Sequence, residues 1–178
     1  MAKTRKTILN REPDNELYTP QCVLDWLPFR PDLDPAWSWQ SNVLPKYYFD
    51  KETDGLKSSW NIPDVKHVWI NPPYEDIQVW IRKCANEATE GRVVIALIQS
   101  KPGERAWMDS IWPRARSVGF LKGRLKHDRP FCLPSQAGTF GSALVLWGSP
   151  EDCDPIVEQI KQRAKGHKHE PVWVKVDR

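Results

Sequence analysis

Four consecutive residues, Asn71-Pro72-Pro73-Tyr74, carry the strongest chemical signal in this sequence. The side-chain carbonyl of Asn71 and an adjacent backbone carbonyl can accept both protons of a ring-bound amino group, and so localise its delocalised lone pair. The two prolines fix φ and offer no competing N–H donor, and the ring of Tyr74 can stack on a flipped base. The pattern favours methyl transfer to an exocyclic amine. The alternative is a rigid Pro-Pro turn leaving a strand, with Tyr74 as an ordinary half-buried aromatic residue.

A strand and a helix are predicted to hold this tetrapeptide between them. Residues 65–70 form the expected strand, and residues 77–88, which are apolar at helical spacing, form the helix. The continuous apolar run at 93–98 is typical of a strand covered on both faces. Further strands are expected at 29–33, 47–49, 118–121, 142–147 and 172–176, and further helices at 20–27, 103–112 and 153–165.

Strands that alternate with helices predict an α/β fold, with an open sheet and helices on both of its faces. In such sheets, ligands bind beyond the carboxyl ends of the strands. Asp34 and Asn71 each follow a predicted strand, so both are expected at that edge. Because few residues separate them, the early part of the sheet must be abbreviated.

The composition is that of a soluble globular protein, with 40% apolar and 28% charged residues among 178. This length predicts a single domain over residues 17–178, preceded by a flexible polar segment at 1–16. No membrane span or secretory signal is recognisable, so we expect a cytoplasmic protein. The four cysteines are scattered, and the pair His167 and His169 lacks other candidate ligands, so no metal site is predicted.

Positive charge concentrates between residues 114 and 129, where six basic residues accompany a single acid, Asp128. This surplus could contact a polyanionic backbone, and the alternative is a solubilising surface segment. Together with the turn-rich stretch that follows, to about residue 139, the segment is the candidate for phosphate contact and target reading. Its basic residues are Arg114, Arg116, Lys122, Arg124, Lys126 and Arg129.

Six short motifs occur in one order along the chain. They are Tyr18-Thr19-Pro20; Leu33-Asp34-Pro35-Ala36 with Ser38 and Asn42; Asp54-Gly55-Leu56 with Trp60; Val68-Trp69-Ile70-Asn71-Pro72-Pro73-Tyr74; Gly123-Arg124-Leu125; and Phe140-Gly141-Ser142. Each is weak alone, but in this order they resemble the bacteriophage Dam-type DNA N6-adenine methyltransferases. The resemblance covers about residues 18–148.

The resemblance implies S-adenosylmethionine as methyl donor, the N6 amino group of adenine in DNA as acceptor, and a bacteriophage origin. It also implies a Rossmann-like methyltransferase sheet with a reversed edge strand near the end. Carried over residue by residue, it assigns catalysis to Asn71, Pro72, Pro73 and Tyr74.

The same resemblance places the methyl donor beside the earlier motifs. Thr19 and Pro20 would help to enclose it, and Asp34, with Pro35 and Ala36, would lie near its methionine portion or ribose. Ser38 and Asn42 are lesser candidates for donor binding, because local hydrogen bonds could equally employ them to tie the turn together.

The donor turn departs from the family pattern at Trp37. The turn Asp34-Pro35-Ala36-Trp37 contains no glycine, and family members often have a small residue where Trp37 stands. The ring of Trp37 could pack beneath the methyl donor or obstruct its binding. Two alternatives stay open. One is a methyltransferase acting on an RNA base or a protein glutamine amide, and the other is a non-catalytic DNA-binding or anti-restriction protein that retains the fold.

Overall fold

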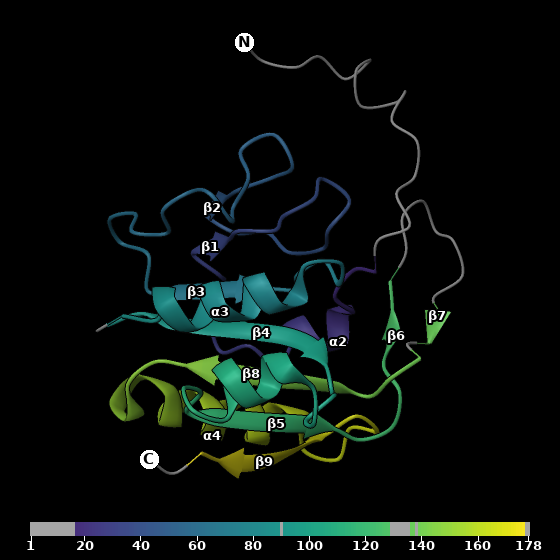
Figure 1. The fold of residues 1–178 in the computed structure, drawn as a ribbon. Helices are drawn as coiled ribbons and strands as arrows, with labels where there is room; N and C mark the ends of the chain where they lie inside the picture. The colour runs from purple at the N-terminus through teal and green to yellow at the C-terminus, as the bar shows by residue number, and fades with distance from the viewer. Residues whose placement is uncertain (1–16, 90, 129–135, 138, 177–178) are drawn as a thin grey trace.

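The computed structural model describes residues 17–89, 91–128, 136–137 and 139–176. Within these ranges the chain forms a seven-stranded sheet with strand order β2-β1-β3-β4-β8-β5-β9, and a separate hairpin of β6 and β7 (Figure 1). Helices connect and cover the strands, and the predicted α/β class is confirmed.

Most predicted elements are found with small shifts at their ends, but the strand expected at 29–33 shares only Leu33 with β1, and the short strands at 126–127 and 136–137 were not predicted. The strands are β1 (Leu33–Asp34), β2 (Tyr47–Tyr48), β3 (His67–Ile70), β4 (Val93–Gln99), β5 (Ser117–Leu121), β6 (Lys126–His127), β7 (Gln136–Ala137), β8 (Ser142–Trp147) and β9 (Pro171–Lys175). The helices are α2 (Gln21–Leu24), α3 (Ile77–Glu87), the wide helical turn η1 (Trp107–Ile111) and α4 (Pro150–Ala164).

The strand directions define a common edge, which we call the carboxyl end of the sheet. β1, β2, β3 and β4 run parallel, and β5 points the same way, because β8 is antiparallel to both β4 and β5. β9 pairs antiparallel with β5 at the sheet edge. The reversed edge strand implied by the resemblance is therefore present as β9, and a second reversed strand, β8, lies inside the described sheet.

Both faces of the sheet are covered, as predicted. Alternate side chains of β4 point to opposite layers: Val94 and Ile98 pack in one core with Trp80 of α3, whereas Ile95 and Leu97 pack in the other with α2 and α4 (Figure 1). All four β4 side chains are buried. This double burial explains why the strand reads as an uninterrupted apolar run.

The first strands are short, in line with the abbreviated early sheet. β1 and β2 contain two residues each. The Asp32 carboxylate stabilises the start of β3, because it accepts hydrogen bonds from the backbone N–H groups of Lys66 (3.0 Å) and His67 (2.8 Å). None of the helices in the described ranges is long and apolar enough to cross a bilayer.

The first helix begins later than the sequence suggested. The pair Thr19-Pro20 predicts an N-cap followed by the first helical residue, but α2 begins at Gln21 and Pro20 takes the cap position without a side-chain hydrogen bond. The prediction of a Thr19 cap was wrong because the helix begins one residue later, and Thr19 Oγ1 is buried without a hydrogen-bond partner among the described residues.

Candidate functional site

Asn71 leaves the end of β3 with its amide held in one orientation. Its Nδ2 donates a hydrogen bond of 2.8 Å to the backbone carbonyl of Leu17. That bond uses the donor half of the amide, and Oδ1 has no hydrogen-bond partner among the described residues. An acceptor oxygen is therefore presented at the carboxyl end of the sheet by a half-buried side chain.

The rest of the tetrapeptide leads directly into α3. Pro72 is buried, Pro73 is exposed and Tyr74 is half-buried. Desolvation raises the pKa of the Tyr74 phenol to about 12, so the ring stays neutral at any physiological pH. A neutral aromatic ring beside a free acceptor is suited to stack on a planar heterocycle.

The segment Leu17–Thr19, which we call the N-terminal strap, joins three parts of the site. The Leu17 carbonyl holds Asn71, and the Tyr18 backbone forms a two-way bridge with Asp128, just beyond β6 (2.9 and 3.2 Å). The Tyr18 hydroxyl donates to Gln40 Oε1 at 2.8 Å. The strap thus links the acceptor residue, the end of β6 and the loop after β1.

Two buried oxygens at this end of the sheet lack full hydrogen bonding. Thr19 Oγ1 is buried without a partner in the described part of the chain. Asp34, 4% exposed, accepts a bond at Oδ1 from the Ala36 N–H (3.0 Å), and burial raises its pKa to about 7. Because Leu33 lies opposite Val68, β1 and β3 are neighbours. Asp34 and Asn71 therefore stand on adjacent strand ends.

The turn after Asp34 packs against the Asp54-Gly55-Leu56 loop. A Cβ added to Gly55 would lie 1.9 Å from the carbonyl oxygen of Pro35, so only glycine allows this backbone approach. Trp60, fully buried, donates from Nε1 to the Gly55 carbonyl at 2.8 Å. Two motifs of the family resemblance therefore meet in space as one support for the Asp34-Pro35 turn.

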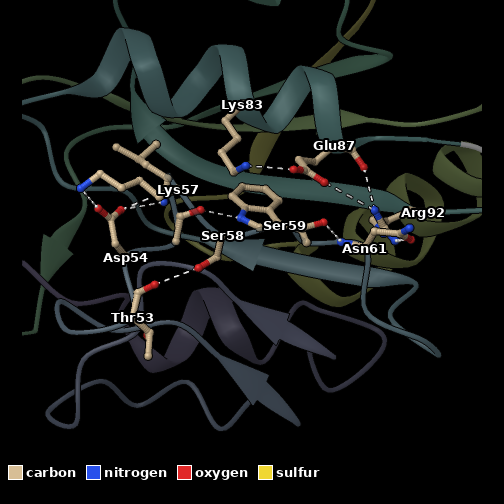
Figure 2. A network of polar contacts seen from close by, with 12 residues as sticks. Thr53, Asp54, Lys57, Ser58, Ser59, Asn61, Lys83, Glu87 and Arg92 are labelled. Atoms are coloured by element: carbon tan, nitrogen blue, oxygen red, sulfur yellow. Dashed lines mark hydrogen bonds and ion pairs between the residues drawn. The ribbon is translucent and has the colours of Figure 1, made fainter.

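Figure 2 shows the polar network that fixes this loop against α3. Arg92 donates to the Asn61 side chain at 3.1 Å and to the Glu87 carbonyl at 3.3 Å. Lys83 of α3 forms an ion pair of 2.9 Å with Glu87, and its ammonium lies 5.3 Å from the centroid of the Trp60 ring. The support is thus anchored to the helix that follows Tyr74.

Ser38 and Asn42, the remaining residues predicted to bind the methyl donor, and their neighbour Trp37 all have hydrogen-bond partners within the protein. Ser38 Oγ lies 3.1 Å from the Tyr18 hydroxyl, and Asn42 Nδ2 donates to the Asp128 carboxylate at 2.8 Å. Trp37 donates from Nε1 to the Val43 carbonyl (3.0 Å). These bonds tie the loop after β1 to the strap and to β6, beyond the purely local role considered as the alternative.

The Trp37 ring packs against Tyr48 of β2, with 4.3 Å between ring centroids. Its indole nitrogen is occupied by the loop's own backbone. The bulky ring is therefore accommodated beside β2.

The structure does not bring the six basic residues together. Arg114 donates to the Ala85 carbonyl and Arg116 forms a bidentate pair with Asp154 at 2.9 and 2.7 Å. Both precede β5 and so lie at the amino end of the sheet. The five residues of β5 span roughly 16 Å at about 3.3 Å per residue, which separates these two arginines from the residues that follow the strand.

Three members of the set follow β5 at the carboxyl end. Lys122, Arg124 and Lys126 are exposed, and Lys122 pairs with Glu170 at 3.2 Å. Arg129 lies outside the described residues. The segment is thus two groups at opposite ends of the sheet, of which only the second lies at the end that carries Asn71.

Sequence reasoning missed the residues that organise the site. Tyr18 belonged to a matched motif, but only its neighbours Thr19 and Pro20 were assigned a role. Asp128 was noted merely as the lone acid of a basic run, and that isolation was the available signal for a specific hydrogen-bonding role. The Leu17 carbonyl carried no signal, because a backbone group is identical at every position.

The sequence is similar to one protein family and to a phage protein. The family described as "DNA N-6-adenine-methyltransferase (Dam)" matches residues 9–166. A protein of Escherichia phage T1 named "DNA N-6-adenine-methyltransferase" is 32% identical over 113 residues, which are 62% of this chain and 46% of the phage protein. The match with this curated relative therefore spans about half of the relative's length.

Proposed function

This chain belongs to the DNA N-6-adenine-methyltransferase (Dam) family, and on that premise we propose that it transfers a methyl group from S-adenosylmethionine to the N6 amino group of adenine in DNA. The observation that carries the proposal is the fixed amide of Asn71, whose bond to the Leu17 carbonyl leaves Oδ1 without a partner among the described residues and available as an acceptor. Family membership supplies the reaction class, and this geometry supports it.

The donor fits the two under-bonded oxygens near the end of β1. Burying a polar group without a partner costs free energy, and a ligand that supplies hydrogen-bond donors removes that cost. The donor's ammonium and ribose hydroxyls are such groups for Thr19 Oγ1 and the Asp34 carboxylate. We assign donor binding to Thr19, Pro20, Asp34, Pro35 and Ala36. When bound, the donor supplies an electrophilic methyl carbon.

The acceptor base is held by the tetrapeptide. The target adenine leaves the duplex, at a cost of a few kcal/mol, and stacks on Tyr74. Asn71 Oδ1 and the Pro72 carbonyl accept the two N6 protons, so the nitrogen lone pair turns toward the methyl carbon. Catalysis comes chiefly from positioning and from dipoles fixed before the reaction. As the bond from N6 to the methyl carbon formed, the bond from that carbon to sulfur would break and leave a neutral thioether, and N6 would then lose its surplus proton to solvent.

The sheet supports a Rossmann-like methyltransferase architecture within one domain over residues 17–178. Parallel strands β1 to β4 carry Asp34 and Asn71 on adjacent ends, which is where open α/β sheets bind ligands. The reversed β8 and β9 complete the sheet on the other side.

For DNA contact we propose the group that follows β5, namely Lys122, Arg124 and Lys126. These exposed cations lie at the same end of the sheet as Asn71, and the β6–β7 hairpin that contains Lys126 stands off the sheet (Figure 1). Lysine and arginine contacts to phosphates would position the duplex. The partners of Arg114 and Arg116 assign those two residues a structural role.

The test is incorporation of labelled methyl groups from S-adenosylmethionine into duplex DNA, RNA and a protein mixture, offered separately to the purified chain. We expect label in DNA, at N6 of adenine. If label appears only in RNA or on glutamine, the assigned acceptor is wrong but the methyl-transfer reaction is still supported. Absence of any transfer, together with no heat on titration with S-adenosylmethionine, would reject the proposal in favour of a non-catalytic DNA-binding protein.

A further inference from the structure

The turn between α4 and β9, residues 165–170, is fastened to the turn that follows β5. His169 is buried, and its Nδ1 lies 2.8 Å from the Lys122 carbonyl. Gly123 has φ +69°, and a Cβ there would lie 3.8 Å from His169 Nδ1. The ion pair between Glu170 and Lys122 adds a second connection at 3.2 Å. The two turns therefore form one surface at the carboxyl end of the sheet.

The same turn also contacts the helix that follows the N-terminal strap. The His167 ring meets Trp26 edge-on, with 5.2 Å between centroids. Lys168 and Asp128 both lie within electrostatic reach of the Cys22 thiol in α2. The α4–β9 turn thus lies beside the segment that follows the N-terminal strap.

This turn carries two cations that no acidic residue in the described part of the chain neutralises. Lys165 and Lys168 are exposed, and neither forms an ion pair within the described ranges. Their neighbours are occupied: Lys161 pairs with Glu158 at 2.6 Å, and Arg163 donates to the Leu27 carbonyl at 2.8 Å. An unpaired pair of lysines on a rigid turn is available to an external anion.

We propose that Lys165 and Lys168 contact the DNA phosphate backbone beside the target base, extending the binding surface of Lys122, Arg124 and Lys126 across the carboxyl end of the sheet. The inference rests on the proposed function, because it assumes that DNA is the substrate. A duplex is a long polyanion, and five exposed cations at the carboxyl end of the sheet match it better than three.

The experiment measures binding of the full-length chain to a duplex of about 25 base pairs at several salt concentrations. Each phosphate contact contributes about 0.9 to the slope of log Kobs against log salt. Lys165→Ala/Lys168→Ala should therefore lower the slope by about 1.8 and weaken binding. Lys165→Arg/Lys168→Arg should restore the slope, because arginine keeps the charge.

The matched control is Lys66→Ala/Lys175→Ala, which removes the same total charge at the opposite end of the sheet, before β3 and at the end of β9. Its slope should equal that of the unmodified chain. If both double alanine variants give the same slope, the Lys165 and Lys168 contact is rejected while DNA binding stands. If the unmodified chain shows no salt-dependent DNA binding, both this inference and the proposed function fail.

Discussion

Asn71 and Asp34 stand on neighbouring strand ends, yet the protein treats their side chains in opposite ways. The amide of Asn71 is oriented by a hydrogen bond to the Leu17 carbonyl, so its acceptor side needs no ligand to be in place. Asp34 is buried with one backbone N–H as its hydrogen-bond donor, and its pKa is raised to about 7. The proposed acceptor half of the site is thus organised in advance, whereas the proposed donor half contains polar groups whose burial a ligand would compensate.

The difference teaches how the two halves should respond to mutation. Damage to the acceptor half should reduce the rate of the chemical step and leave donor affinity intact. Damage to the donor half should change donor affinity and its dependence on pH. Four substitutions test this division, in order of decreasing expected effect.

Asn71→Ala should give the largest loss, roughly 10²–10³-fold in kcat, which is typical when one preorganised hydrogen-bonding group is removed. Donor affinity, measured by calorimetry, should be nearly unchanged. Asn86→Ala is a suitable control, since Asn86 accepts a hydrogen bond from Arg114 away from the site. A strong fall in donor affinity for Asn71→Ala would mean that the two halves are not separate.

Asp34→Asn should weaken donor binding by roughly 10–100-fold, because a charge-assisted hydrogen bond contributes about 1.5–3 kcal/mol. In the unmodified chain, donor binding should tighten as the pH rises through about 7, where Asp34 ionises. The variant should lack that dependence. If donor affinity depends on pH identically in both proteins, Asp34 does not bind the methyl donor.

The same carboxyl group also determines a pH dependence of folding stability without the donor. The folded-state pKa of about 7 lies above the ordinary value of 3.8, so the folded chain holds this proton more tightly than the unfolded chain. Its contribution is fully present below pH 3.8 and is lost as the pH rises through 7, by about 4 kcal/mol. Urea unfolding at pH 5 and 8 should show about 3 kcal/mol of this loss in the unmodified chain relative to Asp34→Asn.

Tyr74→Ala should reduce methyl transfer by roughly tenfold or more, since stacking of one base contributes about 1–3 kcal/mol. Tyr74→Phe keeps the ring and should retain most of the activity. The comparison is made with single-turnover rates on duplex DNA. Equal losses in the two variants would show that the hydroxyl, and not the ring face, is the functional part.

Tyr18→Phe should have the smallest effect, a few-fold, because it removes the hydroxyl contacts to Gln40 and Ser38 and keeps the backbone bridge to Asp128. Both KM for the donor and kcat should shift slightly, since the strap touches both halves of the site. A change in only one of the two parameters would assign the strap to one half alone.

The sequence was sufficient for the parts of the fold that have strong local patterns. β3, α3, β4 and β8 were predicted nearly to the residue, because buried strands and amphipathic helices have regular apolar spacing. The Asn71 tetrapeptide was found for the same reason, as it lies between two such elements. By contrast, β1 and β2 contain two residues each, which is too short to show a repeating pattern of apolar residues.

The contacts that organise the site could not be predicted, because they join residues far apart in the chain. The bond from Asn71 to the Leu17 carbonyl spans 54 residues, and that from Asn42 to Asp128 spans 86. The basic segment illustrates the same limit. Its charges are close together in the sequence. However, β5 runs from the amino end of the sheet to the carboxyl end between Arg116 and Lys122, and so separates them.

The reversed strand β8 has a consequence for how the chain is made. It lies between β4 and β5 and pairs with both, so the most apolar strand of the protein keeps one side open until residues 142–147 have left the ribosome. Open strand edges promote association between nascent chains. A chain cut short before Ser142 should therefore aggregate during synthesis, and completion of the sheet should wait until residues 142–147 are available.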